Sequence, residues 1–172
     1  MVQFDIINNV IISAKYLFMK KNYLNFYNKL IKLTRNKRLY IEFGIEDNFS
    51  NRLVLLLIHF AFFFKVFKSV DNNKVLQEIY DYTFRQLELS IREIGYGDQS
   101  INKKMKDYLN LFHDIIDKIH YWDDINSNDQ QVLIRSYLGL NKNQHLVSYF
   151  NDYYRNLLKN NLNSYLKSVN TD

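Results

Sequence analysis

Apolar residues recur at helical spacing in three long segments of the chain. Over residues 5–33, 70–94 and about 98–119 they fall three or four positions apart, and polar residues fill most positions between them. A repeat near 3.6 residues places the apolar side chains on one face of a helix. We therefore predict three amphipathic helices, each with one face turned toward a common core.

A fourth segment is apolar on nearly all sides. Residues 53–64 contain a single polar residue, His59, and a basic residue flanks each end of the run. These 12 residues are fewer than the roughly 18–20 that a membrane-spanning helix needs. Residues 47–50 offer several N-cap candidates, and the helix is predicted to extend to about residue 68. We expect it to lie at the centre of a helical bundle and not to span a membrane.

Shorter helices are predicted in the rest of the chain. Residues 39–43 form a helical turn that Gly44 can end in a left-handed conformation. Ser127 and Gln130 match a capping box ahead of a short helix. A final helix is predicted over residues 144–166.

The composition favours a helical globular domain. The chain has no proline, no cysteine and only four glycines in 172 residues, and 47% of it is hydrophobic. A β-sandwich or barrel needs many turns, and a phosphate-binding loop needs clustered glycines. The absence of cysteine excludes disulfides, thiolate metal sites and a cysteine nucleophile. We predict one all-α domain over residues 1–172, a single-domain helical bundle of about six or seven helices.

Positive charge is concentrated in the first part of the chain. The net charge is +5, but residues 1–69 hold 11 basic against 4 acidic residues, a net +7, and the remainder holds 12 against 14, a net −2. Eight cations with no acid between them form a predicted basic face: Lys15, Lys20, Lys21, Lys29, Lys32, Arg35, Lys37 and Arg38. Such a face suits RNA, anionic lipid or an acidic protein.

Aromatic residues lie between these lysines. Tyr16, Phe18, Tyr23, Phe26 and Tyr27 could stack on the bases of single-stranded RNA. The alternative is that they fill the core of the bundle.

The histidines offer weak candidates for chemistry. His113, Asp117 and His120 have the spacing of one helix face and could share a divalent ion. The polar face of an amphipathic helix produces such spacing by chance, so we predict no metal and no cofactor. His59 is expected to be a hydrogen-bonded core or interface group. No catalytic spacing of serine, histidine and acid occurs, and we predict that the protein is not an enzyme.

The most distinctive stretch is residues 91–101, with the sequence IREIGYGDQSI. Gly95 is expected to end one helix, Gly97 to allow a tight turn and Asp98 to cap the next helix. Three lysines follow: Lys103, Lys104 and Lys106. These three cations follow closely after the start of the predicted helix, and their position suggests contact with an acidic or phosphate-bearing partner.

This stretch resembles the signature of the ubiquinol–cytochrome c chaperone family, assembly factors for respiratory complex III. The family pattern is Leu-Arg-Glu-hydrophobic-Gly-Val-Gly-Asp, followed by a hydrophobic residue and lysines. A second segment, residues 40–59, resembles the family's Tyr-x-x-x-Gly-Val-Pro-Asp, Gly-Arg-Phe and Leu-His elements in order and spacing, and it contains Arg52 and His59. The resemblance covers about residues 27–119.

The chain departs from the family pattern at several positions. Glu46 replaces a proline, Asn51 a glycine and Tyr96 a valine. The family's Phe-Tyr-Gly-Arg becomes Phe-His-Asp-Ile at residues 112–115, so the resemblance does not extend to whatever that arginine binds.

The resemblance implies a non-enzymatic chaperone that binds newly made cytochrome b as its client and has no small-molecule substrate. It also implies a small protein partner, and contact of the basic face with a ribosome or an anionic membrane. Without an evident presequence we favour the bacterial cytoplasm, peripheral to the inner membrane, over the mitochondrial matrix. The alternative is a basic peripheral membrane- or RNA-binding module that acts through Lys15–Arg38.

The two motifs supply the predicted working surface. Its charged members either contact a partner or hold the helix corner together as an ion network. We expect nine residues to form or shape this surface: Arg52, His59, Arg92, Glu93, Gly95, Gly97, Asp98, Lys103 and Lys106.

Overall fold

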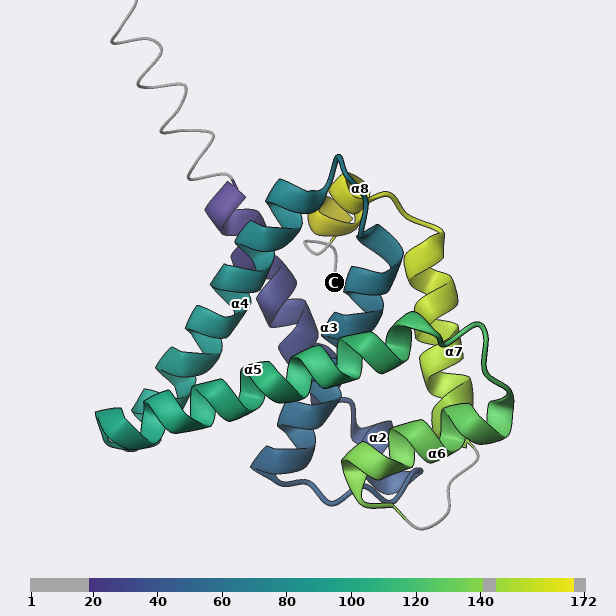
Figure 1. Cartoon of the computed structure of the whole chain (residues 1–172), viewed down its shortest axis with the longest axis horizontal. Coiled ribbons are helices and arrows are strands. Elements are labelled where there is room, and N and C mark those ends of the chain that lie inside the picture. The colour runs from purple at the N-terminus through teal and green to yellow at the C-terminus, as the bar shows by residue number, and fades with distance from the viewer. Residues whose placement is uncertain (1–18, 141–144, 169–172) are drawn as a thin grey trace, which may run out of the picture.

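The computed structural model describes residues 19–140 and 145–168, and these residues form helices and connecting turns with no strand. Residues 19–34 are helical, which agrees with the predicted first helix, and its earlier part lies outside the described residues. The helices that follow are α2 (Lys37–Ile41), α3 (Phe49–Phe67), α4 (Asn73–Glu93), α5 (Asp98–His120), α6 (Ser127–Leu138), α7 (His145–Leu158) and α8 (Leu162–Lys167). The predicted all-α bundle is confirmed over this part of the chain (Figure 1).

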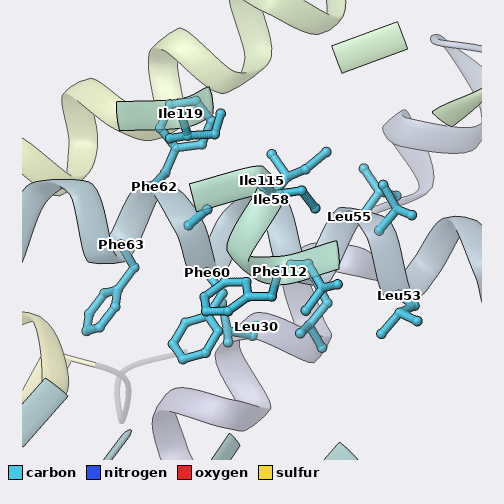
Figure 2. Packing of buried hydrophobic residues seen from close by; sticks show 14 of the residues in the cluster. Leu30, Leu53, Leu55, Ile58, Phe60, Phe62, Phe63, Phe112, Ile115 and Ile119 are labelled. Carbon is cyan, nitrogen blue, oxygen red and sulfur yellow. The ribbon is translucent and has the colours of Figure 1, made fainter. Parts of the chain in front are cut away.

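Helix α3 is the centre of the bundle, as predicted. It begins at the N-cap Asn48, whose side chain accepts from the backbone N–H of Asn51, and every residue from Leu53 to Phe63 is buried. Aromatic and aliphatic residues of α3 pack against Phe112, Ile115 and Ile119 of α5 (Figure 2). Helices α6 and α7 cover other sides of α3.

By length and composition alone, α3 could cross a membrane. Within the structure, however, 61% of its most apolar 18-residue window is buried against other helices. An apolar helix that is covered in this way has the properties of a core helix, because its side chains are already removed from water by the rest of the fold.

Helices α4 and α5 meet at a corner over residues 94–97 and diverge from it. Tyr23 fixes α4 to the first helical stretch, because its hydroxyl donates to Glu78 Oε2 at 2.7 Å. Figure 1 shows the α4–α5 corner at the left edge of the molecule, on the side away from α6, α7 and α8. The fold therefore places the most distinctive sequence motif at the end of a projecting helical hairpin.

Two predicted helix boundaries in the C-terminal third are wrong. The N-cap of α6 is Asn126, whose side chain accepts from the backbone N–H groups of Asn128 and Asp129, and not a capping box of Ser127 and Gln130. The Gln130 side chain instead donates to the backbone oxygen of Trp122 at 2.8 Å.

The single helix predicted over residues 144–166 is two helices, α7 and α8, and residue 144 lies outside the described residues. The chain bends at residues 159–161 because Asn161 forms a reciprocal capping box with Ser164. This box starts α8 in a new direction.

Candidate functional site

The α4–α5 corner is shaped by its two glycines. The Gly95 backbone has φ +96°, a left-handed conformation that side chains with a Cβ disfavour, and its N–H donates to the Arg92 backbone oxygen at 2.9 Å. Gly97 is extended and is the N-cap residue of α5. Asp98 is therefore the first residue of the helix, and the prediction that it caps α5 is wrong. Its carboxylate still lies in the first turn, where negative charge is favourable.

Arg92 joins the two sides of this corner. Its Nε and Nη2 donate to Glu88 Oε1 at 3.0 and 2.7 Å, and its Nη1 donates to Asp98 Oδ1. The hydrogen bonds to Glu88 and then to Asp98 raise the pKa of the Arg92 guanidinium above its usual value. The Arg92 side chain is 40% exposed and that of Asp98 is 82% exposed, so water screens the pair and its main effect is to orient the corner.

The other motif residues at the corner are exposed. Glu93, Lys103 and Lys106 form no ion pair with another described residue. Ile94 is 59% exposed and Tyr96 is 44% exposed, and Lys104 Nζ lies 4.5 Å from the centroid of the Tyr96 ring. The corner therefore presents apolar and charged side chains together, which is the mixture found in protein-binding surfaces.

Arg52 and His59, from the second motif, do not lie at this corner. Arg52 sits at the beginning of α3 and makes a two-bond contact with Asp47, through Nε at 2.6 Å and Nη2 at 2.9 Å. These bonds lower the pKa of the Asp47 carboxyl. The contact links the loop before α3 to the first turns of that helix, so Arg52 has a structural role here.

His59 lies inside the core and is completely buried. Its Nδ1 is 2.6 Å from the Leu55 backbone oxygen, and its Nε2 is 2.8 Å from the Tyr149 hydroxyl. With the proton on Nδ1, the ring donates to Leu55 and accepts from Tyr149, so both nitrogens are satisfied. The expectation of a hydrogen-bonded core histidine is confirmed, and His59 shapes the fold by linking α3 to α7.

The residues that suggested a metal site are not gathered into one. His113 Nε2 lies 3.2 Å from the Tyr80 hydroxyl, and the backbone oxygen of His120 accepts from Lys65 Nζ. Within residues 19–140 and 145–168, no group of three histidine or acidic side chains could hold an ion.

The predicted basic face is divided in the structure. Lys20, Lys21, Lys32 and Arg35 are exposed on one side of the first helical stretch, and none forms an ion pair in the described part of the chain. The other members behave differently, and Lys15 lies outside the described residues. Exposed Lys37 begins α2, exposed Arg38 pairs with Glu42 at 2.9 Å, and the half-buried Lys29 lies 3.9 Å from the Tyr165 ring centroid.

The aromatic residues of this segment do not form a surface for RNA bases. Tyr23, Phe26 and Tyr27 are buried, so the stacking interpretation is wrong for them and the core interpretation is right. Tyr16 and Phe18 lie outside the described residues.

Sequence reasoning missed two partners of the motif residues. Glu88 precedes Arg92 by one helical turn, and this i, i+4 spacing of opposite charges could have identified the pair. Tyr149 is 90 positions from His59, and nothing local in the sequence indicates their contact.

Comparison with known proteins identifies the family. The family model described as ubiquinol-cytochrome C chaperone matches residues 41–134, which is more than half of the chain. The chain therefore belongs to the ubiquinol–cytochrome c chaperone family, and this membership supports a role as an assembly chaperone for respiratory complex III. Residues 91–101 and all of the second motif except Tyr40 fall within the matched residues.

A solved structure supports the same fold. The crystal structure of the Cbp3 homolog from Brucella abortus superposes with a TM-score of 0.74, covers 91% of each chain and is 22% identical in sequence. At that identity the similarity shows the fold. No curated protein sequence matches the chain.

Substitution of alanine for each of the two corner glycines is expected to change the free energy of unfolding by different amounts. Gly95→Ala forces a Cβ into a left-handed conformation and should lower the free energy of unfolding by about 1–2 kcal/mol. Gly97→Ala meets no atom within 4 Å and has ordinary backbone angles, so its effect should stay within about 0.5 kcal/mol. Urea unfolding of the two variants tests this, and equal losses would contradict the described corner.

Burial of His59 predicts that acid destabilises the fold. Burial lowers the His59 pKa from 6.5 to about 4. Between these values mainly the unfolded chain binds the proton, so stability should fall by about 1.5 kcal/mol from pH 6.5 to pH 5. The free energy of unfolding of His59→Gln should depend less on pH over this range. Equal slopes for the wild-type protein and this variant would contradict the assignment.

Proposed function

We propose that the chain is a non-enzymatic chaperone that binds newly made cytochrome b during assembly of respiratory complex III. Family membership supports the chaperone role. The observation that carries the finer proposal is the placement of the family signature on an exposed, projecting corner rather than in the core. The proposal requires no cofactor and no small-molecule substrate.

The α4–α5 corner is the proposed client-binding surface. Cytochrome b is a membrane protein, and such a client exposes apolar segments until it is assembled. Ile94 and Tyr96 supply exposed apolar contacts, while Lys103 and Lys106 supply positive charge beside them. Gly95 and the Arg92 network would hold these groups in place.

Photo-crosslinking in cells tests this surface directly. A photoreactive residue in place of Glu93, which is exposed and forms no ion pair with another described residue, should capture cytochrome b. The same residue in place of Val132, exposed on α6 and away from the corner, should capture much less. Asp98→Asn removes the charge that Arg92 contacts, and we expect it to reduce capture from position 93.

Two results would refute the proposed client. One is equal capture of cytochrome b from positions 93 and 132. The other is capture of other proteins only, with complex III assembling normally in a strain that lacks the protein.

The proposal includes a location and further partners. We place the protein in a bacterial cytoplasm, peripheral to the inner membrane, where newly made cytochrome b would be accessible. A ribosome that is synthesising the client and a small protein partner are the proposed further contacts.

A second candidate function is contact with an anionic membrane through the basic face. Lys20, Lys21, Lys32 and Arg35 lie on one exposed side of the first helical stretch, and residues 15–38 contain no acid. Tyr23, Phe26 and Tyr27 are buried, so these rings do not offer a surface on which RNA bases could stack. The basic face therefore suits lipid phosphates better than RNA.

Vesicle sedimentation distinguishes this candidate. The protein should bind vesicles with anionic lipid more tightly than neutral ones, and binding should weaken as salt rises. Lys32→Glu with Arg35→Glu should reduce binding about tenfold or more, since each basic residue near the surface contributes about 1 kcal/mol. Lys103→Glu with Lys106→Glu makes the same change in net charge at the corner and should have less effect. Equal effects of the two pairs would exclude a specific basic face.

A further inference from the structure

A groove lies between α4 and α5, next to the corner. It has a volume of about 640 Å³, and its apolar lining comes from Tyr80, Phe84 and Leu89 of α4 and from Met105 and Leu109 of α5. Phe84 is buried in the core and Leu89 is 45% exposed, so the lining runs continuously from the core to the surface. Within the described part of the chain, this lining is open to solvent.

Polar contacts mark both ends of the groove. At one end the Tyr80 hydroxyl and His113 Nε2 lie 3.2 Å apart and connect α4 to α5. At the other end Glu88 is held by Arg92 at the corner. Tyr80 and Glu88 are eight residues apart on one helix, so the groove extends for about 12 Å. That length accommodates about two turns of another helix.

Positive and negative side chains are distributed unevenly along the groove. Arg85 lines the groove, and Lys106 lies one helical turn before Leu109 on α5. Both are exposed, and neither forms an ion pair with another described residue. Arg92 pairs with both Glu88 and Asp98, so these three residues together carry one net negative charge. The two unpaired cations Arg85 and Lys106 outweigh it, and the half of the groove near the corner has a net positive charge. Asp81, which accepts from Gln77, lies toward the His113 end and makes the far half negative.

We propose that this groove binds an amphipathic helix of a partner protein. The apolar stripe of that helix would cover the lining residues, and its carboxylates would pair with Arg85 and Lys106. The proposal rests on the proposed chaperone role and adds to it a second contact, which adjoins the exposed corner and shares Lys106 with it.

Charge distinguishes this occupant from an apolar membrane segment. A helix that is apolar on all sides would cover Arg85 and Lys106 without pairing them, and removing unpaired cations from water is costly. A helix with acidic residues beside its apolar stripe satisfies both requirements. Docking an amphipathic helix between two helices is also a common form of protein recognition.

Fluorescence anisotropy with designed peptides tests the groove in the full-length protein. The probe is a labelled amphipathic peptide of about 18 residues, with a leucine stripe flanked by glutamates. We expect it to bind the wild-type protein at least about tenfold more tightly than a peptide of the same composition in scrambled order. Arg85→Glu with Lys106→Glu should weaken binding of the acidic peptide at least about tenfold. The same double variant should bind a counterpart peptide with lysines in place of glutamates more tightly than wild type does.

The matched control is Lys32→Glu with Arg35→Glu, which changes the net charge equally on the first helical stretch. Unchanged binding of the acidic peptide to this variant, together with unchanged far-UV circular dichroism of both double variants, supports the groove. Equal weakening in the two double variants would show general attraction to a basic chain and overturn the proposal. No preference over the scrambled peptide would overturn it as well.

Sedimentation velocity tests a second copy of the chain as the occupant. A concentration-dependent dimer that is lost in the Arg85→Glu, Lys106→Glu variant would place another copy in the groove and overturn the proposal of a different partner. The peptide assay contains no cytochrome b, so failure of the crosslinking experiment and failure of this proposal give separate results.

Discussion

The packing of Phe112 is the contact on which the rest of the structure depends. Its ring stacks on Phe60 of α3 with centroids 5.0 Å apart, and it meets Phe84 of α4 edge-on at 5.3 Å. One side chain of α5 therefore joins the three longest described helices, and Figure 2 shows its position beside Phe60. Phe112, Ile115 and Ile119 anchor the C-terminal half of α5 in the core. Ile101, near the corner, is buried in the same core cluster, so α5 links the centre of the bundle to the corner with α4.

The sequence predicted the helices well and their ends less well. Apolar periodicity identified α3, α4 and α5 to within a few residues, because each buries one continuous face or, for α3, nearly every side. It did not separate α7 from α8, since residues 159–161 contain neither glycine nor proline and the periodic pattern continues across them. The cap of α6 was assigned one residue too late, because Asn126 and Ser127 are both good caps and the backbone angles decide between them.

In the candidate site, too, local sequence predicts some features, and others depend on the three-dimensional fold. The glycine turn and the exposed charges of the corner could be anticipated from local sequence, as could the Glu88–Arg92 pair from its helical spacing. The contact of Arg92 with Asp98 depends on the angle at which Gly95 turns the chain. The two motifs also have different physical roles: His59 and Arg52 stabilise the fold and its entry loop, whereas the corner residues remain in contact with water.

The burial of α3 also has a kinetic consequence. This helix has 19 residues and is apolar enough to enter a bilayer, and the fold keeps most of its apolar surface covered by neighbouring helices. If the chain unfolds beside a membrane, the released segment has two competing destinations, the protein core and the lipid. Refolding must then be faster than insertion for the protein to recover. For such a chain, a high barrier to unfolding protects the functional state more than a large equilibrium stability does.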